Sequence, residues 1–145
     1  MTLYRALTND ELAEISEGLT LASHLLGPGV PPDADGLQVL YDALLGDPTR
    51  PPAAVNALGF AFGQILLENR WLEWAMLLDD EFGSEISVAV VDRQLGCSPL
   101  SMIRNRLDDG EAWDLRELRD ATIRRLRQLG QQAGPSPLGG PLGKT

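Results

Sequence analysis

Apolar residues recur at three- and four-residue spacings near the start of the chain, which is typical of a helix with one buried face. Thr8 and Glu11 have the spacing of a capping box, and Leu7 is placed to pack against Leu12 as a hydrophobic staple. Gly27-Pro28 is predicted to end this helix. The predicted core-facing stripe consists of Leu12, Ile15, Leu19, Ala22 and Leu26.

Two further helices are predicted before residue 70. Asp33 or Asp35 can cap the second helix, which ends at Gly46. The third begins at Pro51 or Pro52 and runs to about Asn69. The apolar stripes are Leu37, Leu40, Tyr41 and Leu44 in the second helix, and Val55, Leu58, Phe62, Ile65 and Leu66 in the third.

The third predicted helix carries two glycines one turn apart, Gly59 and Gly63. Each glycine costs about 1 kcal/mol relative to alanine inside a helix. Close approach of another backbone would offset that cost, so we expect this helix to cover one face of the sheet.

The apolar period changes from that of a helix to two residues after Asn69. Apolar positions alternate with others from Trp71 to Leu78 and from Ile86 to Val90, with turn residues at Asp79–Gly83 between them. This pattern predicts an antiparallel β-hairpin over residues 71–91. Residues 93–97 are predicted as a possible third strand.

Helical spacing returns at Ser98-Pro99, which opens a short helix on Leu100, Ile103 and Leu107. Asp114 and Glu117 repeat the capping spacing before a last helix that ends at Gly130. Residues 131–145 are rich in Gln, Gly, Pro and Ser, and are predicted to be a disordered tail. Residues 1–130 are therefore expected to form a single α+β domain with N-terminal helices, a small antiparallel sheet and two C-terminal helices.

Four short motifs follow one another through the middle and C-terminal parts of the chain. They are Leu58-Gly59 with Gly63, Leu72-Glu73-Trp74, the acidic turn Asp80-Glu81-Phe82-Gly83, and Pro99 to Glu111, which holds Met102-Ile103, Arg106 and Gly110-Glu111. In this order they resemble a bacterial family described only as domain of unknown function 3806. The resemblance covers about residues 55–120. Because that family has no established activity, it implies a related fold and no reaction.

The charge of the chain disfavours two classes of partner. The 145 residues include 21 acidic and 12 basic ones, for a formal net charge of −9. Such a body repels phosphate backbones and anionic lipid, so neither nucleic acid nor a membrane is expected as a partner. Acids dominate residues 1–92, whereas residues 93–130 hold a small excess of arginine. This asymmetry predicts internal charge pairing more readily than a site for a polyanion.

The chain is expected to work in the cytoplasm. Its single cysteine, Cys97, cannot form an intrachain disulfide, which fits a reducing compartment. Asp10 and Glu11 stand where a signal peptide would need an apolar core. The longest uncharged stretch, residues 51–67, is interrupted by proline and glycine and is too short to span a bilayer.

Histidine, cysteine and lysine, which many enzymes use for catalysis, each occur only once in this chain. No catalytic residue, cofactor or metal is therefore predicted. His24 is the only histidine and lies off its helix stripe, where a capping or surface role is favoured. Cys97 precedes a helix start that could lower its thiol pKa, but packing is favoured because no base is evident. Lys144, the only lysine, stands in the tail, which argues against Schiff-base and phosphate-loop chemistry.

The densest acidic cluster consists of Asp79, Asp80, Glu81 and Glu85. Several carboxylates in one loop suit Ca²⁺ or Mg²⁺, but the spacing is not that of a calcium loop, and a solvated turn is favoured. Together with Arg104 or Arg106, this turn supports an alternative function, a small ligand- or metal-binding protein or an enzyme.

The favoured hypothesis is a non-enzymatic protein-interaction module, of an immunity or adaptor type, that binds a basic partner through its acidic N-terminal half and hairpin turn. Trp71 and Trp113 are candidate interface anchors, because tryptophan is enriched at binding hot spots, whereas Trp74 is expected in the core. A homodimer built on these two tryptophans is a further possibility. The candidate interaction residues are Trp71, Asp79, Asp80, Glu81, Arg106 and Trp113.

Overall fold

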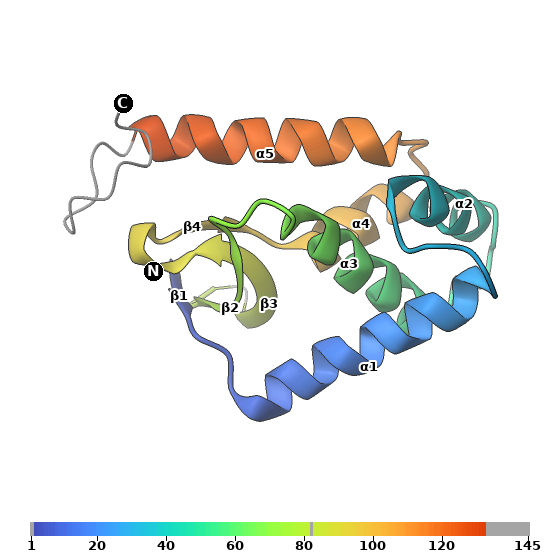
Figure 1. The fold of residues 1–145 in the computed structure, drawn as a ribbon, viewed down its shortest axis with the longest axis horizontal. Helices are drawn as coiled ribbons and strands as arrows, with labels where there is room; N and C mark the ends of the chain where they lie inside the picture. Colours follow the sequence, from blue (N-terminus) through green and yellow to red (C-terminus); the bar gives the residue numbers. More distant parts are fainter. Residues whose placement is uncertain (1, 82, 133–145) are drawn as a thin grey trace.

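The computed structural model describes residues 2–81 and 83–132. Within them the chain has an α+β fold, with five α-helices and one four-stranded antiparallel sheet. In Figure 1, α3 lies in the middle, α1 and α5 run along opposite sides, and the sheet stands at one end. The elements are β1 (Thr2–Arg5), α1 (Asn9–Leu26), α2 (Ala34–Leu45), α3 (Pro52–Leu66), β2 (Glu73–Asp79), β3 (Gly83–Val90), the 3₁₀ turn η1 (Val91–Arg93), β4 (Leu95–Cys97), α4 (Pro99–Asp108) and α5 (Leu115–Gln132).

The predicted hairpin is confirmed as β2 and β3, which pair with Trp74 opposite Val88. The possible third strand is present as β4, limited to three residues. The fourth strand, β1, was not predicted, since four residues are too few to show an alternating pattern. It pairs with β2 and places Leu3 opposite Leu78.

Gln94 joins the two edges of the sheet. This residue has a positive φ of 51° and directly precedes β4. Its side-chain oxygen accepts a hydrogen bond from the Tyr4 amide at 2.7 Å, and its side-chain nitrogen donates to the Tyr4 carbonyl at 3.0 Å. The free edge of β1 is therefore occupied at Tyr4, and α5 contacts β4 at the other edge of the sheet.

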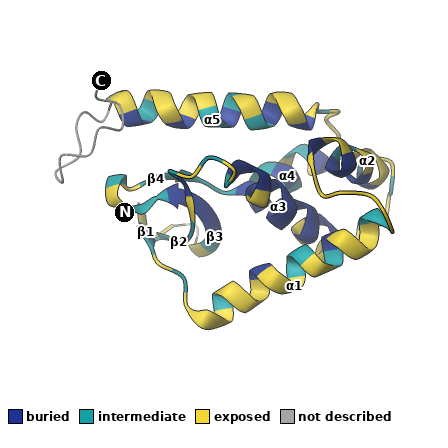
Figure 2. Cartoon of the chain, viewed as in Figure 1, coloured by how far each residue is buried: buried dark blue, intermediate teal, exposed yellow. Residues whose placement is uncertain are grey.

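The core is built around α3, which is buried on nearly every side (Figure 2). The predicted close approach is confirmed at Gly59, where an added Cβ would lie 2.8 Å from the Leu100 Cα of α4. Gly63 instead accommodates the ring of Trp74 from β2 and the ring of Pro99. The glycines thus admit a helix backbone at one position and a side chain of the sheet at the other.

Most predicted helix ends are confirmed. The Thr8–Glu11 capping box is present, Asp33 caps α2, and the Asp114 carboxylate accepts from the amides at the start of α5. Two ends differ. Helix α3 stops at Leu66, before Asn69. Helix α5 continues through Gly130 to Gln132, because Gly130 is buried and its carbonyl accepts a hydrogen bond from Arg93 at 2.6 Å.

Two further expectations about the ends of the chain were tested. The predicted tail begins in helix, since residues 131 and 132 belong to α5, and residues 133–145 lie outside the described residues. Leu12 was predicted on the core-facing stripe of α1, and this is wrong, because Leu12 is 48% exposed. Leu7, the other member of the predicted staple, packs on the cluster around Ile15 and Met76.

Candidate functional site

The predicted acidic turn follows β2 and is solvent-exposed. The Asp79 carboxylate accepts a hydrogen bond from the Glu81 amide at 2.8 Å, which stabilises the turn itself. Asp80 and Glu81 are exposed. Leu78, just before the turn, packs in the cluster that includes Ile15 of α1, so the turn starts from the part of the sheet next to α1.

Glu85 is separated from the turn and faces α4. Its carboxylate accepts from the Ser101 hydroxyl at 2.6 Å and from Arg104 at 3.3 Å, and Arg104 also donates to Ser101 at 2.8 Å. The structure therefore brings Arg104 to one member of the predicted acidic cluster. Because both Glu85 oxygens already accept hydrogen bonds, this group links β3 to α4.

Arg106 lies elsewhere, at the junction of α4 and α5. Its guanidinium stands 4.6 Å from the centre of the Trp113 ring and donates to the Met102 carbonyl at 3.1 Å. Nearby, the Tyr41 hydroxyl donates to the Glu111 carbonyl at 2.5 Å, and the Gln38 side chain bonds to the backbone at Trp113 and Leu115. Arg106 and Trp113 are thus candidate residues that the structure brings together, apart from the acidic turn.

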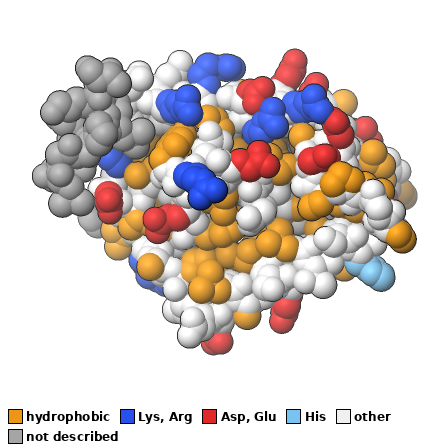
Figure 3. All heavy atoms as spheres, in the orientation of Figure 1, with side chains coloured by type: hydrophobic (Ala, Val, Ile, Leu, Met, Phe, Trp, Pro, Cys, Tyr) orange, Lys and Arg blue, Asp and Glu red, His pale blue; other side chains and the backbone are white. Residues whose placement is uncertain are grey.

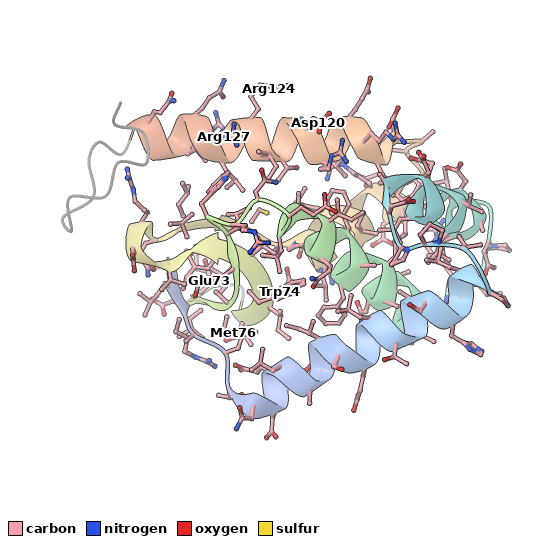
Figure 4. All side chains as sticks on the ribbon, in the orientation of Figure 1. Glu73, Trp74, Met76, Asp120, Arg124 and Arg127 are labelled. Atoms are coloured by element: carbon pink, nitrogen blue, oxygen red, sulfur yellow. The ribbon has the colours of Figure 1, made fainter. Side chains whose placement is uncertain are left out.

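Trp71, the other candidate anchor, lies beside the opposite end of α5. It is partly exposed, and the Arg127 guanidinium lies 5.6 Å from the centre of its ring. Trp74, which was expected in the core, is also only partly buried. It packs edge-to-face on Phe60 at 6.2 Å and faces Gly63. Figure 4 shows Trp74 and Met76 on the side of the sheet that faces α1, and Arg124 and Arg127 on α5.

Two shallow hollows lie along α5, and we call the larger one the α5 hollow. It has a volume of about 600 Å³ and is lined by Glu68, Asn69, Arg119, Asp120, Ile123, Arg124, Arg127, Gln128 and Gln131. The smaller, of about 510 Å³, is bounded by Trp113 and by the ion pair of Arg116 with Asp35 at 2.5 Å. Three arginines of α5 line the larger hollow, and one of them, Arg119, pairs with Asp120 at 2.9 Å.

The outer face of α1 carries an acidic stripe that sequence reasoning missed. Asp10, Glu14 and Glu17 are exposed, and none of them has a hydrogen bond or ion pair with any described residue. Their spacing of four and three residues places them on one side of a helix, so the signal was present. Leu12 and Leu25 are 48% and 41% exposed on the same helix. In Figure 3 acidic side chains lie along the lower rim, where α1 runs, and basic and acidic ones alternate along α5.

Glu11 is the exception on α1, because it is paired. Arg5 donates two hydrogen bonds to its carboxylate, at 2.9 and 2.8 Å, and the Thr8 amide donates a third. These bonds, chiefly those from Arg5, lower the pKa of Glu11 to about 2. The Glu11 carboxylate therefore stabilises the start of α1.

Cys97 and His24, the candidate nucleophile and the candidate base, lie in different surroundings. Burial raises the pKa of the Cys97 thiol to about 12, so the thiolate is scarce at neutral pH, contrary to the possibility of a thiol activated by the helix start. His24 is exposed on α1 and borders a shallow hollow with Glu17 and Leu21. Within residues 2–81 and 83–132, no group of three His, Cys, Asp or Glu residues could hold a metal ion, and no helix has the length and apolar character to cross a bilayer.

Comparison with known proteins gives one match. A family model described as Domain of unknown function (DUF3806) matches residues 33–118, which is more than half of the chain. The matched segment runs from the cap of α2 to the first residues of α5, so it starts earlier than the predicted 55–120 and leaves α1 outside. No curated protein and no solved structure matches the chain.

Proposed function

We propose that this chain, which belongs to the DUF3806 family, is a non-enzymatic protein-interaction module that binds a basic protein partner. An adaptor or an immunity-type protein, which neutralises a basic toxin or nuclease, is the class of function that this binding would serve. The chain would act in a reducing compartment such as the cytoplasm, since Cys97 is a free thiol.

The observation that carries the proposal is the outer face of α1. Three carboxylates, at Asp10, Glu14 and Glu17, lie on one side of this helix with no partner among the described residues. Leu25 is exposed on the same side of the helix, about two turns beyond Glu17. Complementary charge accelerates encounter with a basic surface, and apolar contacts beside it supply affinity.

The acidic turn supports the same function from a neighbouring position. Asp80 and Glu81 are exposed, and the turn leaves the sheet from the part that packs near Ile15 of α1. The turn therefore extends the negative surface of α1. Addition of a partner strand to β1 is not part of the proposal, because Gln94 occupies that edge at Tyr4.

The proposal is tested by affinity capture from cell extract, with the unmodified chain compared with variants whose surface charges are reversed. The immobilised chain should retain a protein of basic isoelectric point, identified by mass spectrometry, and the purified protein should bind again on its own. Glu14→Arg/Glu17→Arg should lose that protein. Asp109→Arg/Glu111→Arg, which changes the net charge equally on exposed positions away from α1, should keep it. Retention by the α1 variant, or no retention by the unmodified chain, contradicts the proposal.

A second candidate function is a ligand or metal site that uses the acidic turn with Arg104. The position of Arg104, beside Glu85 of β3, favours the ligand-binding form of this candidate, since a guanidinium can bind an anionic group but repels a metal cation. A thermal-shift screen with divalent ions and anionic metabolites checks it, because a ligand that binds the native state must raise the unfolding midpoint. An unchanged midpoint across the screen counts against this candidate.

A further inference from the structure

We propose that the basic surface recognised by α1 includes the α5 hollow of a second copy of this chain. The inference rests on the proposed function, because it uses the same face of α1, and it names a partner for it. Copies would then associate through two different surfaces, the acidic outer face of α1 on one and the α5 hollow on the next.

The α5 hollow has the composition of a protein-binding surface. Arg119, Arg124 and Arg127 line it around Ile123, together with the carboxylates of Glu68 and Asp120, of which Asp120 pairs with Arg119. Arg124 and Arg127 have no carboxylate partner among the described residues, and Trp71 lies against Arg127. Arginine and tryptophan are the residues most enriched at binding hot spots. Asn69, Gln128 and Gln131 add side-chain amides, which can both donate and accept hydrogen bonds.

The two surfaces carry opposite net charge, since the arginines of the hollow outnumber its carboxylates by three to two, and they have similar lengths. The carboxylates of α1 extend from residue 10 to residue 17, about 10 Å along the helix axis. The guanidinium groups of the hollow extend from residue 119 to residue 127, about 12 Å. With the two helices antiparallel, Asp10 would lie opposite Arg127 and Glu14 opposite Arg124, the two arginines of the hollow without a carboxylate partner among the described residues. The antiparallel arrangement also places the positive end of each helix dipole beside the negative end of the other.

The positions of the two helices decide the kind of assembly. Helices α1 and α5 run along opposite sides of the molecule (Figure 1), so one chain cannot bring its own two surfaces together. A contact between two different surfaces leaves one of each free at the ends. Association would therefore continue beyond a dimer, into short open chains or a ring.

The net charge of −9 opposes this contact over long distances. At about 0.15 M salt the Debye length is about 8 Å, so the repulsion between whole molecules is screened more strongly than ion pairs at direct contact. Exposed ion pairs contribute little individually, so apolar contacts of Trp71 and Ile123 with Ala13 and Leu21, which lie on the acidic side of α1, must supply the rest. The expected affinity is accordingly in the micromolar range.

Sedimentation velocity of the full chain tests the inference, at about 0.15 M salt and from about 5 to about 500 µM protein. The mean mass of the unmodified chain should rise with concentration from the monomer value of 15.7 kDa past that of a dimer. Glu14→Arg/Glu17→Arg and Arg124→Glu/Arg127→Glu should each remain monomeric. Asp109→Arg/Glu111→Arg, the control for net charge, should associate like the unmodified chain.

The decisive variant combines both reversals in one chain, Glu14→Arg/Glu17→Arg/Arg124→Glu/Arg127→Glu. Its net charge is unchanged at −9, since the two reversals cancel, and its surfaces are complementary with opposite polarity. It should regain association. Circular dichroism confirms that each variant is folded, and about 1 M salt should dissociate the assemblies of the unmodified chain.

Three results would overturn the inference: a monomeric unmodified chain at the highest concentration, association that survives reversal on α1, or a combined variant that stays monomeric. A monomeric chain that still captures a basic protein through α1 would overturn this inference alone and leave the proposed function standing. Self-association through α1, with no other protein captured, would support the inference and remove the separate basic partner.

Discussion

The two longest helices, α1 and α5, have 18 residues each and lie on opposite sides of the same core, yet their outer faces differ. On α1, three exposed carboxylates have no partner among the described residues. On α5, three of the five arginines are already engaged, Arg116 with Asp35, Arg119 with Asp120 and Arg127 with Trp71. The expected internal charge pairing between residues 93–130 and the acidic remainder is found, among the described residues, in Arg116 with Asp35 and in Arg104 with Glu85.

The inner faces differ as well. Helix α5 uses buried leucines, including Leu118 at 3% and Leu126 at 3% exposed, to cover α2, α3 and β4. Helix α1 packs mainly on α3, with Gly18 against the ring of Phe60, and buries only Ile15 and Ala22 fully enough to be called core. The comparison indicates that α5 contributes more to stability, whereas α1 keeps more of its surface available for binding.

The largest expected effect comes from truncating the inner face of α5. Leu126→Ala should lower the free energy of unfolding by about 2 to 5 kcal/mol, because it removes buried methyl groups and leaves a cavity. Leu12→Ala on α1 should change it by less than about 0.5 kcal/mol, since that side chain is 48% exposed. Urea unfolding of both variants measures the difference, and equal losses would remove the contrast between the helices.

The next largest expected effect on stability comes from the close contact of α1 with α3. Gly18→Ala should cost about 1 to 3 kcal/mol of stability, because the added Cβ meets the Phe60 ring inside a packed interface. Gly18→Ala/Phe60→Leu should recover part of the loss by making room. If Gly18→Ala stabilises the protein, as helix propensity alone would predict, then α1 is held less tightly than the structure implies.

The start of α1 should carry a pH dependence. The pKa of Glu11 is about 2 in the folded chain, below its ordinary value of 4.5, so its stabilising contribution is full above pH 4.5 and is lost as the pH falls toward 2. Urea unfolding between these pH values should show a steeper loss of stability for the unmodified chain than for Glu11→Gln. Glu14→Gln controls for the removal of one acidic group from the same helix. Identical slopes for Glu11→Gln and the unmodified chain would contradict the assigned pairing.

The smallest expected effect is that of the ion pair between α5 and α2. Arg116→Ala should lower the free energy of unfolding by no more than about 1 kcal/mol, because both side chains are more than half exposed, at 59% and 71%. Asp35→Ala and the double variant complete a thermodynamic cycle. A coupling energy well above 1 kcal/mol would show that charge holds α5 in place as strongly as its leucines do.

Helices and caps could be predicted from the sequence because they depend on residues close together in the chain. The Thr8–Glu11 box, the Asp33 cap and the proline starts at Pro52 and Pro99 all use interactions within a few residues. The hairpin followed from a period of two residues on both sides of a turn. The same local reasoning failed at Gly130, where a contact from Arg93, distant in sequence, continues the helix.

What could not be predicted depends on long-range contacts of single side chains. Gln94 bonds to Tyr4 across 90 residues, so nothing local identified β1 as a strand. Arg50, which has a positive φ of 35°, donates to carbonyls at the ends of both α2 and α4, namely those of Leu44, Leu45 and Leu107. Arg106 and Trp113 were both named as candidates, but only the fold shows that they contact each other.

The central claim is that the outer faces of α1 and α5 are complementary binding surfaces, and amide chemical shifts measured by NMR at increasing protein concentration test it most directly. We predict concentration-dependent shifts in residues 10–17 and in residues 119–131, with the core of α3 unchanged, and loss of both sets in Glu14→Arg/Glu17→Arg. Shifts confined to residues 79–85, or an unchanged spectrum over the whole range, would contradict the claim.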